Sequence, residues 1–171
     1  MSGTLPMSYF HMSPSTYVVG DEIFGNGRDK VDARIEDELE KRRPDGAFPR
    51  RGAVYCLEST DFTTCGVVSS GYIYQVVPSG EPQRRDFSWI GEMQKALLRL
   101  KYTQYERMKE YPEWSPDLIE KCCSGYWNGE ATNTPGWEYL TSSCTVVEVV
   151  AGELIDPKST NGGWRPRGAI S

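Results

Sequence analysis

The spacing of the apolar residues changes several times along this chain, and that change constrains the fold more than any other feature. Short aromatic or β-branched runs occur at residues 7–13, 53–57, 72–77 and 145–150. Such runs favour strands. Ile90, Met93, Leu97 and Leu100 instead recur at helical spacing. The two periods within 171 residues predict a single α+β domain spanning residues 1–171.

Two further segments carry helical signals. Val31, Ile35 and Leu39 form a narrow apolar stripe on a charged background, which predicts a surface helix over residues 31–43. Ser115 followed by Pro116 is typical of a helix start, with serine at the N-cap. We therefore expect one long and one short helix to form an insertion at about residues 88–123. The Gly- and Pro-rich tail, about 157–171, is expected to be irregular.

Composition limits the possible partners and compartment. The net charge of −5 gives no general attraction to nucleic acid or anionic membranes, although it does not exclude a local basic patch. No apolar run approaches the roughly 18 residues of a membrane span, and no secretory signal is present. Five cysteines without a CxxC pair, and one histidine, argue against a disulfide framework and a zinc finger. These features predict a cytoplasmic protein with no membrane or metal partner.

Three polar or aromatic residues stand at the edges of the expected strands. His11 lies near the end of the first strand, Tyr55 lies within the second, and Glu138 precedes the last. Each has an ordinary explanation when it is taken alone: a half-buried histidine, a packed aromatic ring and a solvated turn residue. Their order and their surroundings are more informative than the single residues.

The pattern resembles the ADP-ribosyltransferases of the His-Tyr-Glu type, which include diphtheria-toxin-like and poly(ADP-ribose) polymerase enzymes and small bacterial and phage relatives. The matching motifs are YFHMS at 9–13, AVYCLESTD at 53–61, and a Glu-x-Leu segment with spacer and strand at 138–149. Met12 departs from the family, because relatives commonly have glycine there. The helical insertion is also longer than the minimal fold requires.

The resemblance implies two packed antiparallel sheets around a cleft for NAD, with helices on the outside. It also implies a role for each matched residue. Glu138 would be the catalytic carboxylate, His11 would bind the adenosine ribose, Ser13 would support the nicotinamide ribose, the Met12 backbone would hold the carboxamide, and Tyr55 would stack on the nicotinamide ring. A carboxylate suits this chemistry, because cleavage of the N-glycosidic bond develops positive charge on the ribose.

Arg50 and Arg51 come directly before the second strand. A guanidinium group there is a candidate for binding the pyrophosphate of NAD, and a solvated loop charge is the equally ordinary alternative. The segment Gly25-Asn26-Gly27 is not a dinucleotide fingerprint, because the third glycine and the surrounding βαβ unit are missing.

The expected function is transfer of ADP-ribose from NAD to a macromolecular acceptor with release of nicotinamide, protein being preferred over nucleic acid as acceptor. Tyr126, Trp127 and Trp137 are candidate acceptor anchors, with core packing as the alternative. By analogy with relatives, a role in bacterial or phage conflict is a hypothesis. An NAD glycohydrolase and a non-catalytic nucleotide-binding or interaction protein remain open as alternative functions.

Overall fold

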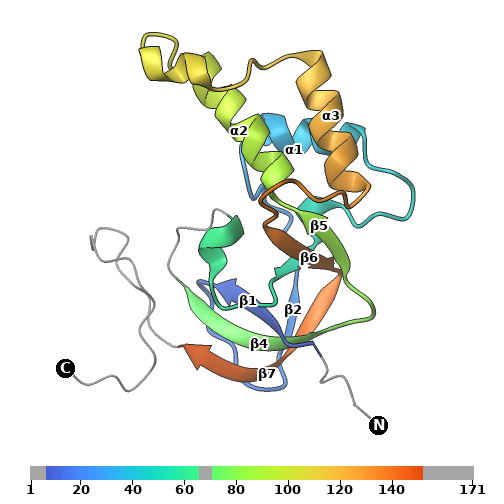
Figure 1. Ribbon diagram of the computed structural model, residues 1–171. Coiled ribbons are helices and arrows are strands. Elements are labelled where there is room, and N and C mark those ends of the chain that lie inside the picture. The colour runs from blue at the N-terminus through green and yellow to red at the C-terminus, as the bar shows by residue number, and fades with distance from the viewer. Residues whose placement is uncertain (1–6, 66–70, 152–171) are drawn as a thin grey trace, which may run out of the picture.

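A computed structural model of the chain describes residues 7–65 and 71–151, and it shows an α+β fold (Figure 1). The strands are β1 Tyr9–Ser13, β2 Glu22–Phe24, β3 Val54–Cys56, β4 Tyr72–Pro78, β5 Gln83–Asp86, β6 Trp137–Thr141 and β7 Ser143–Ala151. The helices are α1 Ala33–Lys41, α2 Ser88–Lys101 and α3 Pro116–Trp127, and the 3-10 turns are η1 Arg50–Gly52, η2 Phe62–Cys65 and η3 Glu106–Glu110.

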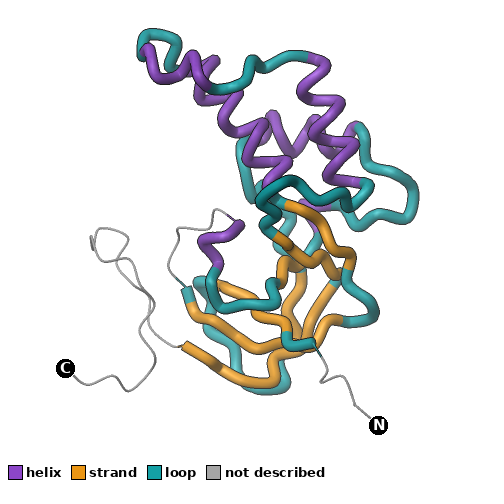
Figure 2. Tube along the Cα trace, in the orientation of Figure 1, coloured by secondary structure: helices purple, strands orange, loops and turns teal. Residues whose placement is uncertain are grey.

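The strands form two antiparallel sheets (Figure 2). One sheet has four strands in the order β1-β4-β7-β2, and the other has three in the order β3-β6-β5. A bridge between Phe10 and Leu57 joins β1 to the chain just after β3, so the two sheets meet along this edge. A core of tyrosine, valine and cysteine side chains from both sheets, including Val54, Tyr74 and Tyr139, fills the space between them.

The three α-helices gather at one end of the molecule, with β5 and β6 between them and the four-stranded sheet (Figure 1). Their apolar faces share one core, in which Ile35 of α1, Met93 of α2 and Cys123 of α3 are fully buried. The helices therefore lie outside the two sheets and cover one end of the sheet structure (Figure 1).

Most of the expected elements are present. The predicted N-cap is confirmed, since the Ser115 side chain accepts a hydrogen bond from the Leu118 backbone at the start of α3. The long helical segment ends at Lys101, and η3 follows it. The insertion thus continues to Trp127 rather than to about residue 123. The expected irregular tail lies outside the described residues.

The sequence interpretation missed three strands, and one feature weakens the strand signal in each of them. β2 has only three residues, β5 reads QRRD without an apolar residue, and β6 carries Glu138 in its interior. Glutamate is depleted in strands, and Pro135-Gly136 before β6 is typical of a turn. Glu138 accordingly looked like a turn residue, although it is part of the sheet.

Within the described residues, no helix has the length and apolar character needed to cross a membrane.

A candidate ligand-binding cavity

A cavity of about 350 Å³ opens where the ends of β1, β2 and β3 meet the segment that leads into α1. This volume is within the range of small-molecule sites. The lining residues are His11, Met12, Ser13, Pro14, Ser15, Tyr17, Ile23, Phe24, Gly25, Asn26, Arg28, Lys30, Ala53, Val54 and Tyr55. Four of the predicted NAD-binding residues thus share one cavity: His11, Met12, Ser13 and Tyr55.

The imidazole of His11 is fixed by β3. Its Nδ1 lies 2.8 Å from the backbone oxygen of Tyr55. A carbonyl oxygen only accepts, so Nδ1 carries the hydrogen, and Nε2 of the neutral ring is an acceptor. Burial lowers the pKa of His11, against the hydrogen bond to Tyr55, and the charge of Lys30 lowers it further. His11 is therefore a neutral group that accepts a hydrogen bond from a donor such as a hydroxyl.

The segment between β2 and α1 brings positive charge to the cavity. Arg28 and Lys30 line it, and no aspartate or glutamate does so in the described part of the chain. The Lys30 ammonium lies 5.6 Å from the centroid of the Tyr55 ring and 3.0 Å from Oδ1 of Asn26. Burial lowers the pKa of Lys30, the charge of Glu36 opposes this shift, and the charges of Arg50 and Arg28 act in the same direction as burial. Two cations in the lining, with no carboxylate among its described residues, favour an anionic ligand.

Beside this cavity, a buried charge network joins the sheets to the helices. The Arg50 guanidinium, only 2% exposed, lies 2.5 Å from Oε1 of Glu138 and 3.0 Å from Oε2 of Glu36. The Tyr126 hydroxyl donates to the same Glu138 oxygen at 2.6 Å and also contacts Arg50. η1, β6, α1 and α3 each supply one of these four side chains. The network therefore holds the helical end of the molecule to the sheet β3-β6-β5.

Tyr55 lies between the cavity and this network. Its hydroxyl donates to the backbone oxygen of Arg50 at 2.6 Å, and its ring centroid lies 5.0 Å from the Arg50 guanidinium carbon. Glu138 itself does not line the cavity, and its side chain is 4% exposed. Of the three residues that carry the resemblance, His11 and Tyr55 line the cavity. Glu138 instead belongs to the buried network, where it binds Arg50.

The two arginines before β3 have separate roles, and neither lines the cavity. Arg50 is the centre of the buried network. Arg51 is exposed and forms ion pairs with Asp29 at 2.5 Å and Asp37 at 2.7 Å. The hypothesis that either guanidinium binds the pyrophosphate has no support in this arrangement, because both are already bound by carboxylates.

Two of the three candidate acceptor anchors are core residues. Tyr126 is 0% exposed and Trp127 is 5% exposed, and both pack among the helices. The prediction that these two rings contact an acceptor is therefore wrong, and the alternative of core packing is confirmed. Trp137 is partly exposed, with the guanidinium of Arg84 4.3 Å from its ring.

The sequence interpretation did not identify Asn26, Arg28 and Lys30 as site residues. A signal was available: two basic residues closely follow the turn Gly25-Asn26-Gly27, and Gly27 has a positive φ of 71°. Such a turn brings neighbouring side chains to one place. Glu36 gave no comparable signal, because it is one of several acidic residues in a charged helix, and only the folded chain shows that it is 2% exposed.

Comparisons of the chain with protein-family models, with curated proteins and with solved structures find no match. The functional interpretation therefore depends on the residues and the geometry described above.

Proposed function

We propose that this protein binds NAD in the cavity formed by β1, β3 and the segment before α1. The observation that carries this proposal is the lining itself: a neutral acceptor imidazole, an aromatic ring and two cations, with no carboxylate among the described lining residues. Ribose hydroxyls match the His11 acceptor, a pyrophosphate matches Arg28 and Lys30, and a flat heterocycle matches the ring of Tyr55.

The second candidate is the activity that the resemblance implies, transfer of ADP-ribose to a macromolecular acceptor. NAD would supply the activated ribose, and a carboxylate of this chain would stabilise the positive charge that develops there. One observation favours Glu138 for this role: it is connected to the cavity through the contacts of Arg50 with Tyr55. The same observation sets a condition, because the carboxylate has to leave Arg50 and Tyr126 to reach a ligand.

The binding proposal is tested by isothermal titration of the full chain with NAD, ADP and nicotinamide. We expect NAD and ADP to bind and nicotinamide alone to bind much more weakly, since the cations recognise the phosphates. In the double variant Arg28→Ala/Lys30→Ala, the affinity for NAD is expected to fall at least about tenfold, as hydrogen bonds to charged groups contribute about 1.5–3 kcal/mol each.

A matched control removes one arginine and one lysine from the exposed surface of α1. Arg34 and Lys41 are 55% and 66% exposed, and neither lines the cavity. The variant Arg34→Ala/Lys41→Ala should bind NAD as the wild type does. Equal weakening in both double variants would show a non-specific charge effect and would contradict the proposed site.

Release of nicotinamide from NAD separates the two candidate functions. Release by the wild type and its loss in Glu138→Gln, with NAD binding retained, would support transfer or hydrolysis. Tight binding without release by the wild type would support a non-catalytic nucleotide-binding protein. Labelled NAD incubated with a lysate, followed by protease or nuclease digestion, then identifies the class of the acceptor.

A further inference from the structure

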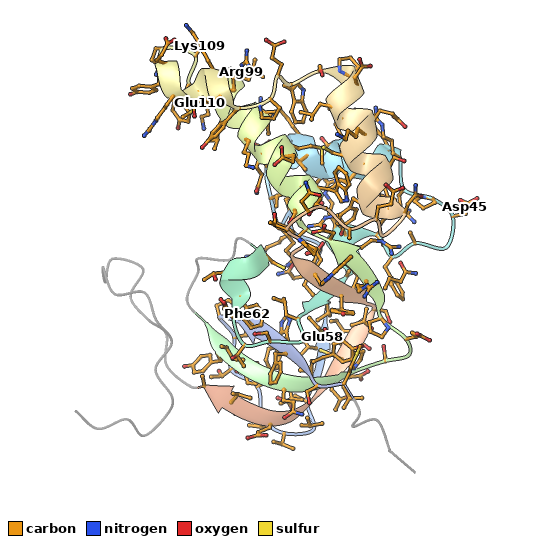
Figure 3. The ribbon with its side chains drawn as sticks, in the orientation of Figure 1. Asp45, Glu58, Phe62, Arg99, Lys109 and Glu110 are labelled. Atoms are coloured by element: carbon orange, nitrogen blue, oxygen red, sulfur yellow. The ribbon has the colours of Figure 1, made fainter. Side chains whose placement is uncertain are left out.

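The far end of the helical region carries a surface that the proposed function does not use. It comprises the C-terminal end of α2 and the turn η3, which project away from the sheets (Figures 1 and 3). Figure 3 labels Arg99, Lys109 and Glu110 at this tip. Residues 92–113 carry five basic and four acidic residues. Lys95, Arg99 and Lys109 form ion pairs with Glu92, Glu113 and Glu106, so Lys101 and Arg107 are the cations of this region that stay available to a ligand.

Two neighbouring tyrosines on this tip are flanked by two cations. Tyr102 is 37% exposed and Tyr105 is 51% exposed, and their ring centroids lie 6.3 Å apart. The Lys101 ammonium lies 5.7 Å from the centroid of the Tyr102 ring, and the Arg107 guanidinium lies 5.8 Å from that of Tyr105. Neither cation is in an ion pair within the described residues. We call Lys101, Tyr102, Tyr105 and Arg107 the tip surface.

The backbone under the tip surface is held in place. The Tyr102 backbone donates to Leu98, and the Tyr105 backbone donates to Tyr102. Arg99 donates from Nη1 to the backbone oxygen of Tyr111 at 2.6 Å, which ties the chain after η3 to α2. Met108 is buried beneath the turn. The backbone that carries the rings and cations is therefore already ordered before a ligand binds.

We propose that the tip surface binds single-stranded nucleic acid. Each nucleotide joins a flat base to a phosphate, so two adjacent aromatic rings match two bases and the cation beside each ring matches a phosphate. A chain of acidic residues such as polyglutamate offers carboxylates but no aromatic ring to stack on the two tyrosines. The surface lies at the opposite end of the molecule from the four-stranded sheet (Figure 1), so binding here does not depend on the NAD proposal.

The test is fluorescence anisotropy of a labelled 12-nucleotide oligo(dT) titrated with the full chain at low salt. Loss of a base stack costs about 1–3 kcal/mol, so Tyr102→Ala/Tyr105→Ala is expected to weaken binding at least fivefold. Lys101→Ala/Arg107→Ala is expected to weaken it as well and to lower the salt dependence by about 1.4 in the log–log slope, for two phosphate contacts.

The matched control is Lys41→Ala/Arg84→Ala. This variant also removes one lysine and one arginine, and Arg84 also lies against an aromatic ring, at Trp137, but both are outside the tip surface. The control should bind the oligonucleotide as the wild type does.

Three results would overturn the proposal. The first is no binding at about 100 µM protein, which corresponds to an affinity below that of ordinary non-specific binding. The second is equal weakening by the control. The third is a pair of results: polyglutamate of the same charge competes as well as unlabelled oligonucleotide, and the Tyr102→Ala/Tyr105→Ala variant binds as the wild type does. This pair would show that the surface binds acidic proteins instead. All substituted side chains are exposed, and circular dichroism verifies that each variant is folded.

Discussion

The guanidinium of Arg50 binds the carboxylate of Glu138 in the interior of the protein, 2.5 Å from nitrogen to oxygen. The Tyr126 hydroxyl donates to the same carboxylate, and Glu36 binds the other side of the guanidinium. A carboxylate held in this way stabilises the packing of the helices against the sheet. It can stabilise charge on a ligand only after its contacts with Arg50 and Tyr126 break.

Glu138→Gln is therefore expected to destabilise the fold. The change removes the charge that faces Arg50, and breaking one partner of a buried ion pair costs about 3 kcal/mol or more. Urea unfolding monitored by tryptophan fluorescence measures the loss. Glu148→Gln, at an exposed position of β7, is the control and should change the free energy of unfolding by less than about 0.5 kcal/mol. Equal stability of Glu138→Gln and the wild type would show that the network contributes little.

The His11 environment predicts a pH dependence of stability. Burial lowers the pKa of His11 in the folded chain, so the unfolded chain takes up a proton first as the pH falls. The free energy of unfolding should therefore decrease as the pH falls below about 6.5, the ordinary value for histidine. Urea unfolding at pH 7.5 and 5.5 should show a larger decrease for the wild type than for His11→Gln. Identical decreases would contradict this account.

The ring of Tyr55 lines the cavity, whereas its hydroxyl forms a hydrogen bond that stabilises the fold. Tyr55→Phe removes the hydrogen bond to the Arg50 backbone and should cost about 1 kcal/mol of stability, with NAD binding nearly unchanged. Tyr55→Ala removes the ring as well and should weaken NAD binding. Denaturation and isothermal titration of both variants distinguish the two roles. Weaker NAD binding in Tyr55→Phe would show that the hydroxyl acts on the ligand.

The close packing of α2 against α3 depends on a glycine. A Cβ atom at Gly125 would lie 2.4 Å from the ring of Trp89, whereas a Cβ at Gly91 would meet nothing within 4 Å. Gly125→Ala should destabilise the protein by about 1–3 kcal/mol through overpacking. Gly91→Ala, in an open helical position, should stabilise it by roughly 0.4–1 kcal/mol. Thermal unfolding compares the two, and a neutral Gly125→Ala would show that Trp89 moves easily.

The sequence predicted elements that carry their own local signal. Ser115-Pro116 begins a helix because capping is a local interaction, and β4 is visible because its apolar residues have a strand period. β5 has no such pattern, since its neighbours in the sheet rather than its own side chains make it a strand. The three strands outside the four apolar runs, β2, β5 and β6, could not be predicted from spacing alone.

The site shows the same division between local and long-range information. Spacing placed His11 and Tyr55 on strands, and the sheet contact at Phe10 and Leu57 brings them to one cavity. The partner of Glu138 could not be predicted, because Arg50 is 88 residues away in the sequence and the neighbouring Arg51 has the same chemistry. Only the fold decides which of the two arginines is buried.

The central claim, NAD binding in the cavity at His11, is tested most directly by proton NMR of the tag-free protein. The chain has one histidine, so its imidazole signals belong to His11 without further assignment. Titration with NAD is predicted to shift these signals with saturation, and Arg28→Ala/Lys30→Ala should move the saturation to higher NAD concentration. Signals that stay unchanged up to several millimolar NAD would contradict the account.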